Sequence, residues 1–241
     1  YTCALMKRLL LRLLGLLTLG PALPLRAQEA ATQPVYVIPI RGMIEPALLY
    51  VIRRGLAEAQ EQQARAVVFV MDTPGGRVDA ATEIVRTIQK IQVPTYTFVE
   101  KDAFSAGAII ALATDHIYMA PGSVIGDAMP IMMSPMGGAP QELSPDVQEK
   151  MVSGVAALIR SAAQESGHDP QLAEKMVRRE IEYKIGDEVI SPSNQLLTLT
   201  NVEAERKLGE SGKPLLSAGT VQDVDALLAA IGRAKATQKT L

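Results

Sequence analysis

Hydrophobic positions along the chain follow two patterns, one typical of buried strands and the other of amphipathic helices. Short, nearly continuous apolar runs predict the strands of a buried parallel sheet, at 35–40, 66–71, 95–99 and 116–120. Residues 46–63 and 78–91 instead place apolar side chains at helical spacing, with Pro46 near the start of the first helix. This alternation predicts βαβ units and an α/β fold with a mostly parallel sheet.

The second half of the chain is expected to be more helical and to contain one hairpin. Amphipathic spacing predicts a helix at 147–165 and a second one at 170–179. Gly186-Asp187 supports a tight turn inside a hairpin at 181–190. The remaining residues predict small elements: a helix from Asn201 to Lys207, a strand at 214–216, a helix at 221–231 and then a frayed polar tail.

The first residues have the pattern of a secretory signal peptide. The charged segment Met6-Lys7-Arg8 precedes an apolar stretch. Leu25-Arg26-Ala27 then resembles a cleavage site with a small residue at its end. The stretch is too interrupted for a firm membrane span, and an uncleaved N-terminal anchor is the alternative. We therefore expect a signal peptide or anchor at 1–27, one folded domain at 34–232 outside the cytoplasm, and a polar tail at 233–241.

Composition narrows the chemistry that the folded domain can perform. Hydrophobic residues make up 48% of the 241 residues and aromatic ones 4%, so the core is expected to be aliphatic. The net charge of −2 argues against nucleic-acid binding. The single cysteine, Cys3, lies in the leader, and the two histidines, His116 and His168, are far apart in sequence. No disulfide, metal or organic cofactor is therefore expected.

Two segments that follow successive predicted strands carry the most informative chemistry. Ser105 lies between the strand at 95–99 and a small-residue helix at 106–113, and Gly75-Gly76 follows the strand at 66–71. A helix start offers free N–H groups, and glycines allow close approach to a substrate carbonyl. Taken singly, such a serine is more often an N-cap and such glycines a turn. Their joint occurrence at strand ends, where open α/β sheets bind ligands, predicts an acyl-transfer site.

A serine nucleophile needs a base, and the histidines are poor candidates. His116 lies at the far end of a helix about 13 Å long, and His168 stands in a polar, exposed setting. A lysine in an apolar pocket can serve, because desolvation disfavours its charged form. Lys101 has acidic neighbours that favour the charged form. Lys150, at the start of an amphipathic helix, is modestly preferred.

Residues 129–145 form an unusual segment before that helix. They contain four methionines, four prolines and two glycines, with no charge before Glu142. Flexible thioether side chains suit irregular apolar ligands, so the segment is expected to be a mobile apolar loop over the site. An ordinary loop packed on the core is the equally weighted alternative.

Four segments in the same order resemble the NfeD family of membrane-associated serine proteases. They are Met-Asp-Thr-Pro-Gly-Gly-Arg-Val at 71–78, Phe-Ser-Ala-Gly-Ala at 104–108, Ala-Pro-Gly-Ser-Val-Ile-Gly-Asp-Ala at 120–128 and Leu-Leu-Thr-Leu-Thr at 196–200. The resemblance covers residues 34–232. It implies the ClpP/crotonase fold of stacked ββα units, and a relation to signal peptide peptidase A.

The resemblance also implies roles for particular residues. Ser105 matches the family's nucleophile, and Lys150 matches its base, a lysine at the start of the helix that ends in Ala-Gln-Glu-Ser-Gly. Gly75 and Gly76 match the turn that holds the oxyanion, as donors or near-donors. The N–H of Ala106, just after the nucleophile, would be the second donor.

One residue departs from the family pattern. Asp127 stands where the family usually has a small residue, and a carboxylate near Lys150 would hold that lysine protonated and weaken the base. This departure supports one alternative function, a catalytically weak or inactive scaffold that binds membrane proteins. A crotonase-type acyl-CoA hydratase or isomerase is the other alternative, although a secretory leader argues against it.

The sequence thus predicts an extracytoplasmic serine endopeptidase with a Ser-Lys dyad. Strands beside the site and the methionine-rich loop favour apolar, extended peptide segments. The family resemblance implies stomatin-like membrane proteins as substrates, a homo-oligomeric assembly and a periplasmic or membrane-associated location on the outer face.

Overall fold

The computed structural model describes residues 33–133, 140–209 and 212–241. The chain divides into two units, 1–32 and 33–241, and the second is described below. The predicted leader at 1–27 and the middle of the predicted apolar loop, 134–139, lie outside the described residues. Within the described residues, no helix combines the length and apolar character that a membrane crossing requires.

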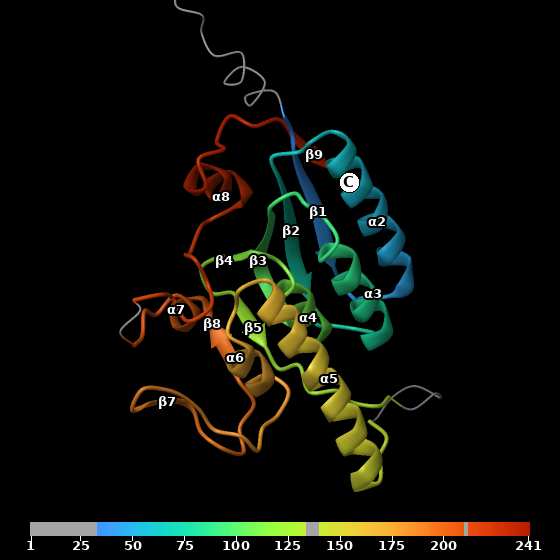
Figure 1. The fold of residues 1–241 in the computed structure, drawn as a ribbon, viewed down its shortest axis with the longest axis vertical. Coiled ribbons are helices and arrows are strands. Elements are labelled where there is room, and N and C mark those ends of the chain that lie inside the picture. Colours follow the sequence, from blue (N-terminus) through green and yellow to red (C-terminus); the bar gives the residue numbers. More distant parts are fainter. Residues whose placement is uncertain (1–32, 134–139, 210–211) are drawn as a thin grey trace, which may run out of the picture. The chain divides into compact units, whose positions relative to one another are not determined.

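A mostly parallel sheet organises the described unit (Figure 1). Its strands follow the order β8-β5-β3-β2-β1-β9, and β4 also pairs with β3. Neighbouring strands run parallel except for the antiparallel pair of β5 and β8. The strands are β1 (Val35–Arg41), β2 (Ala66–Thr73), β3 (Thr95–Phe104), β4 (His116–Met119), β5 (Val124–Gly126), β8 (Thr198–Thr200) and β9 (Gln238–Thr240). The predicted α/β fold with a mostly parallel sheet is therefore confirmed.

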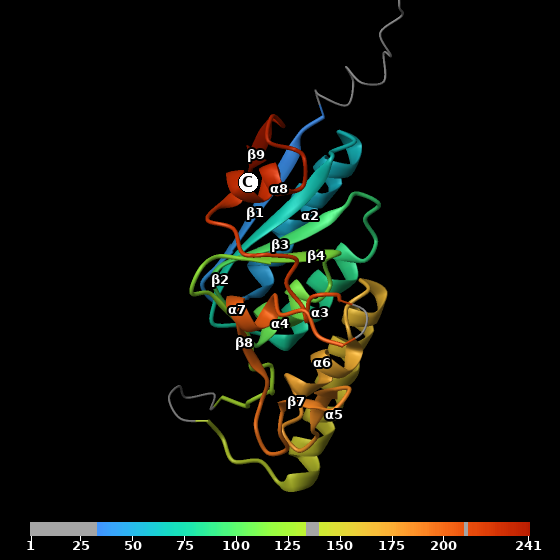
Figure 2. The ribbon, with the colours of Figure 1, turned by 90° about the vertical axis from the view of Figure 1, so that its left-hand side faces the viewer.

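Helices cover both faces of the sheet because the central strands are apolar on both faces. On one face, Tyr36, Ile38 and Phe69 belong to a core with α2 (Pro46–Glu61), α3 (Val78–Ile88) and α4 (Ala106–Ala111). On the other face, Val37 and Val68 pack with α8 (Val224–Ala230). Figures 1 and 2 show α8 on the opposite side of the sheet from α2 and α3.

The second half of the chain adds elements beyond the carboxyl ends of the central strands. The long helix α5 (Pro145–Glu165) packs against α6 (Pro170–Lys175), and α5 also contacts α3 and α4. The strands β6 (Tyr183–Ile185) and β7 (Glu188–Ser191) form the predicted hairpin around Gly186. A four-residue helix, α7 (Asn201–Ala204), follows β8.

Several sequence predictions are wrong in detail. The frayed tail instead contains β9, whose Gln238–Thr240 pair in parallel register with β1. Residues 214–216 form no strand, and only an isolated bridge joins Pro214 to Lys207. Thr200, not Asn201, caps α7 through a capping box with Glu203. The strand β9 was missed because its three polar residues leave no hydrophobic period to read.

Candidate active site

The strands β2 and β3 bring the two predicted site segments to the same edge of the sheet. Thr73, the last residue of β2, pairs with Ala103 near the end of β3. The Thr73 hydroxyl donates to the carbonyl oxygen of Gly42 at 2.6 Å and accepts from the Gly75 N–H at 3.0 Å. The Pro-Gly-Gly turn is therefore fixed by a buried side chain, directly beside the segment that carries Ser105.

Ser105 occupies an unusual backbone conformation at the corner between β3 and α4. Its φ of 52° and ψ of −118° match the first central position of a type II′ turn, which favours glycine. Two carbonyl oxygens hold this conformation, because the Ser105 N–H lies 3.1 Å from the oxygens of both Gly126 and Asp127. Such a serine projects its hydroxyl from a sharp strand-to-helix turn, as serine nucleophiles do in other α/β folds.

Gly75 lies in close contact with Ser105, and Gly76 lies in close contact with the backbone of Ile44. A Cβ atom on Gly75 would lie 2.6 Å from the Ser105 Cβ and 3.1 Å from its Oγ, and the Gly75 φ is +106°. A Cβ atom on Gly76 would lie 2.2 Å from the Ile44 carbonyl oxygen. Both positions therefore require glycine, the first because of the serine and the second because of the neighbouring backbone.

Two backbone N–H groups near Ser105 are placed to act as donors. Ile44 donates to the Gly75 carbonyl and accepts from the Arg77 N–H, both at 2.8 Å. In a parallel bridge of this kind the N–H of the intervening Gly76 points away from Ile44. Ala106 begins α4, so its N–H has no partner within the helix. The structure thus brings Ser105, Gly75, Gly76 and Ala106 together.

A cavity of about 840 Å³ opens in front of Ser105. Most of its lining is apolar and comes from three regions: Met43 and Ile44 after β1, Val78 of α3, and the strap, which we define as residues 129–133. Several of these side chains are well exposed, including Met43 at 61% and Ile131 at 62%. An exposed apolar lining beside a serine suits an extended apolar ligand.

Charged side chains also reach this cavity. Glu45, Arg77 and Asp127 contribute to its lining. Arg77 forms a bidentate pair with Asp79, with nitrogen–oxygen distances of 2.9 and 2.6 Å. The hydrogen bonds from Arg77 lower the pKa of Asp79 to about 2, and the same pair raises the pKa of Arg77.

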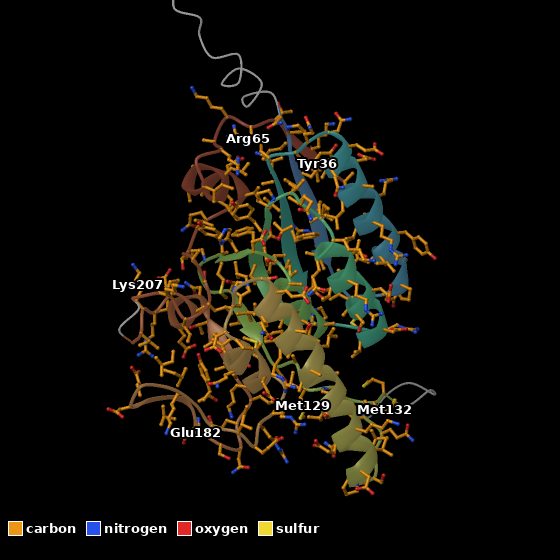
Figure 3. The ribbon with its side chains drawn as sticks, in the orientation of Figure 1. Tyr36, Arg65, Met129, Met132, Glu182 and Lys207 are labelled. Carbon is orange, nitrogen blue, oxygen red and sulfur yellow. The ribbon has the colours of Figure 1, made fainter. Side chains whose placement is uncertain are left out.

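Lys150 lies in a neighbouring groove rather than in the Ser105 cavity. This groove, of about 800 Å³, runs between α3 and α5 and includes Val85, Met151 and Leu158. The strap separates the two spaces: Met129, Ile131 and Met133 line the Ser105 cavity, whereas Pro130 and Met132 line the groove. Figure 3 labels Met129 and Met132 beside α5, and Met132 lines the groove together with Lys150. Lys150 is exposed.

The other candidate bases are occupied elsewhere. Lys101 forms an ion pair with Asp72 at 3.2 Å and is 70% exposed. The His168 Nε2 lies 2.8 Å from the Thr114 carbonyl oxygen, and burial lowers the pKa of this histidine. The His116 ring stacks at a tilt on Tyr96, 5.1 Å away. None of these side chains lines the Ser105 cavity.

Sequence reasoning missed a buried lysine. Lys175 is fully buried, and its ammonium donates to the carbonyl oxygens of Arg179, Ile181 and Pro192, at 3.0, 2.5 and 2.8 Å. Desolvation lowers the pKa of Lys175. Because its three hydrogen atoms are all engaged, Lys175 serves as a structural tie between α6 and the hairpin, not as a base.

Missed too were Gly126 and the role of the Asp127 backbone, whose carbonyls hold Ser105. Gly126 has a φ of +140°, and a Cβ there would lie 2.4 Å from the Leu197 oxygen. The segment is fixed from its other side as well, since the Asp127 N–H donates to Leu197 and the Ala128 N–H to Met176. The dipeptide Gly126-Asp127 could have indicated this turn, because both residue types tolerate a positive φ. Among the described residues, no cluster of His, Cys, Asp or Glu could hold a metal ion.

The mostly parallel sheet with helices on both faces places the chain in the ClpP-like class of folds. The chain superposes on ClpP1 from Listeria monocytogenes with a TM-score of 0.50 at 16% identity, covering 84% of this chain and 98% of that one. Residues 34–241 match the family described as NfeD1b, N-terminal domain. The chain belongs to this family.

Two curated relatives extend the similarity. The chain is 34% identical over 208 residues to the membrane protein NfeD1b of Bacillus subtilis, covering 86% of this chain and 43% of the relative. It is 33% identical over 207 residues to the membrane-bound protease PH1510 of Pyrococcus horikoshii, covering 81% and 45%. The chain therefore spans less than half the length of these relatives.

Solved structures point the same way. A serine-to-alanine mutant of the 1510-N membrane-bound stomatin-specific protease matches with a TM-score of 0.66 at 27% identity, covering 87% of this chain and 98% of that one. A lysine-to-alanine mutant of the same protease, in complex with a substrate peptide, matches with a TM-score of 0.66 at 28% identity, covering 88% and 92%.

Proposed function

We propose that this chain is the protease domain of a membrane-associated serine endopeptidase in which Ser105 is the nucleophile. One observation carries the proposal: a serine in a strained backbone conformation lies in close contact with Gly75 of the Gly-Gly turn and opens onto an exposed, largely apolar cavity. Strain of this kind is retained where function needs it. The relatives named as proteases, one of them solved as a serine mutant and a lysine mutant, support the same reading.

The proposed reaction is acyl transfer to Ser105. Lys150, in its uncharged form, accepts the proton of the Ser105 hydroxyl while Oγ attacks the peptide carbonyl carbon. The N–H groups of Gly76 and Ala106 hold the oxyanion, and each such donor contributes about 2.7–4 kcal/mol to lowering the barrier. Lys150 then gives the proton to the leaving amine, and water hydrolyses the acyl-enzyme.

The position of Lys150 sets a requirement on this mechanism. Because Lys150 lines the groove and not the Ser105 cavity, its amine must pass the strap to reach the serine. Hydrogen bonds of catalytic groups often form only when substrate is bound. We therefore propose that an apolar peptide entering the cavity shifts the strap and admits the lysine.

The proposed substrates are apolar segments of membrane-associated proteins, with stomatin-like proteins as the first to test. The exposed Met43, Ile131 and Met133 side chains at the cavity favour such segments. The relative 1510-N is named stomatin-specific, and both curated relatives are named membrane proteins. We extend these properties to this chain, together with a location on the outer face of the membrane and assembly into a homo-oligomer.

Labelling with a fluorophosphonate probe tests the nucleophile. The unmodified protein should be labelled and should cleave a panel of apolar peptides, and Ser105→Ala should abolish both. Lys150→Ala should abolish cleavage, while Lys101→Ala serves as a matched control because Lys101 pairs with Asp72 on the surface. Absence of labelling in the unmodified protein would remove the serine assignment, and full cleavage by Lys150→Ala would remove the dyad alone.

A second function is favoured by the separation of Lys150 from Ser105. If the lysine never crosses the strap, the same apolar cavity binds membrane proteins without cutting them, as a scaffold. Peptide binding by the unmodified protein without labelling or cleavage would identify this case.

A further inference from the structure

Among the described residues, two carboxylates that line the Ser105 cavity, those of Glu45 and Asp127, have no ion-pair partner. Of the charged residues that line the Ser105 cavity, Arg77 is neutralised by its bidentate pair with Asp79, and the charge of Glu45 also acts on Arg77. The Asp127 carboxylate, in contrast, makes no hydrogen bond or ion pair with any described residue. Asp127 is therefore the unpaired carboxylate of this cavity that lies beside Ser105, whereas Glu45, which also forms no ion pair with a described residue, stands near Arg77.

Asp127 also lies directly beside the reacting serine. Its carbonyl oxygen accepts the Ser105 N–H at 3.1 Å, so the two residues are held together by the backbone. Its side chain is exposed and lines the same cavity as Ser105 and Met129. A peptide bound across Ser105 would therefore bring one of its own side chains next to this carboxylate.

The backbone explains only part of the choice of residue here. The Asp127 φ is 44°, a left-handed conformation that favours glycine, asparagine and aspartate. Asparagine would satisfy the conformation equally well and would place no charge beside Ser105. The negative charge itself thus needs another explanation.

We propose that Asp127 selects a basic side chain adjacent to the cleaved bond, so that the preferred substrate is an apolar segment that carries a lysine or arginine. This inference rests on the proposed function, because it takes the Ser105 cavity to be the peptide site. A bound apolar peptide excludes water from the cavity and would leave the carboxylate poorly solvated. A basic side chain on the peptide restores a partner, whereas an acidic one adds repulsion.

Binding to the Ser105→Ala form tests the selection without requiring cleavage. Fluorescent peptides of leucine, methionine and alanine carry lysine, norleucine or glutamate at each central position in turn, and anisotropy gives the Kd of each. At one position we expect the lysine peptide to bind about two- to fivefold more tightly than the norleucine peptide, with glutamate weakest. High salt should reduce this ratio.

Two matched variants test whether the preference for the lysine peptide over the norleucine peptide comes from the Asp127 carboxylate. Adding Asp127→Asn should abolish the lysine preference, because the backbone is retained and the charge is lost. Asp187→Asn, at the exposed turn of the β6–β7 hairpin, removes the same charge from outside the cavity and should preserve the preference. A preference that survives Asp127→Asn, or no preference at any position, would overturn the inference.

Cleavage of the same peptides by the unmodified protein, measured in parallel, separates this inference from the proposed function. Lysine-selective binding without cleavage would retain the role of Asp127 and reject the protease. Cleavage without selectivity for lysine would retain the protease and reject the role of Asp127.

Discussion

The backbone of Ser105 predicts that the protein becomes more stable when its proposed nucleophile is replaced by glycine. Ser105 has a φ of 52° and a ψ of −118°, a region in which a Cβ atom is unfavourable. Three hydrogen bonds impose this conformation: the N–H lies 3.1 Å from both the Gly126 and Asp127 oxygens, and Ile109 donates to the Ser105 oxygen at 3.2 Å. Ser105→Gly removes the Cβ and retains all three bonds.

The magnitude follows from two opposing effects. A residue held in a sparsely populated region costs about 1–3 kcal/mol, which glycine recovers. Glycine also gains freedom in the unfolded chain, which lowers stability by about 0.4–1 kcal/mol relative to alanine. Ser105→Gly should therefore exceed Ser105→Ala in unfolding free energy by about 1.3 kcal/mol at the midpoints of these two ranges, and each kcal/mol corresponds to about 2–4 °C in Tm.

Urea unfolding of the two variants measures this difference directly. Both variants lack the hydroxyl, so the comparison reports on the backbone alone. Ser166, at the end of α5 with a φ of −93°, gives the matched control, because there the glycine variant should be the less stable one. If Ser105→Gly is no more stable than Ser105→Ala, the strain attributed to the nucleophile is absent.

Three further predictions concern the surroundings of the site. Gly75→Ala places a Cβ 2.6 Å from the Ser105 Cβ at a φ of +106°, so it should slow fluorophosphonate labelling severely and lower the unfolding free energy by about 1–3 kcal/mol; normal labelling would contradict the close approach. Lys175→Met leaves three carbonyl oxygens without their ammonium donor and should lower the unfolding free energy by about 1–3 kcal/mol in urea, whereas the exposed Lys184→Met should change stability little; equal effects would contradict the structural tie. Burial lowers the pKa of His168 below 6.5, so the unfolded chain binds more protons than the folded one as the pH falls below 6.5, and stability should decrease there. A His168→Gln variant should lose that part of the pH dependence, and an unchanged pH profile of the unfolding free energy would contradict the assignment.

The central elements of the fold could be predicted because the spacing of their hydrophobic residues is typical of buried strands or of amphipathic helices. The apolar runs at 35–40, 66–71 and 95–99 became β1, β2 and β3, and the helical periods at 46–63 and 78–91 became α2 and α3. What could not be predicted were β5, β8 and β9, three-residue strands whose pairing partners lie far away in sequence. Their pairing is decided by tertiary contacts and not by local pattern.

The site was predictable in part for a similar reason. Ser105 and the Gly75-Gly76 turn follow adjacent parallel strands, and adjacent parallel strands end at the same edge of a sheet. Gly126 and Lys175 were missed because their roles depend on contacts with Leu197 and with the β6–β7 region, which no spacing in the sequence reveals. The groove that contains Lys150 likewise depends on how α3 and α5 pack.

The two halves of the proposed dyad differ in how the fold holds them. Ser105 and the Gly75-Gly76 turn are fixed by hydrogen bonds to the carbonyls of Gly126 and Asp127, to the Thr73 hydroxyl and to the Ile44 backbone, all of which form without a substrate. Lys150 stands on the exposed first turns of α5, with only the strap between it and the cavity. In the proposed mechanism, the geometry at the serine is therefore a property of the sheet, whereas proton transfer requires the strap to shift. Substitutions in the strap that leave the stability unchanged should accordingly lower the rate of peptide cleavage. They should have a much smaller effect on the rate at which a fluorophosphonate labels Ser105.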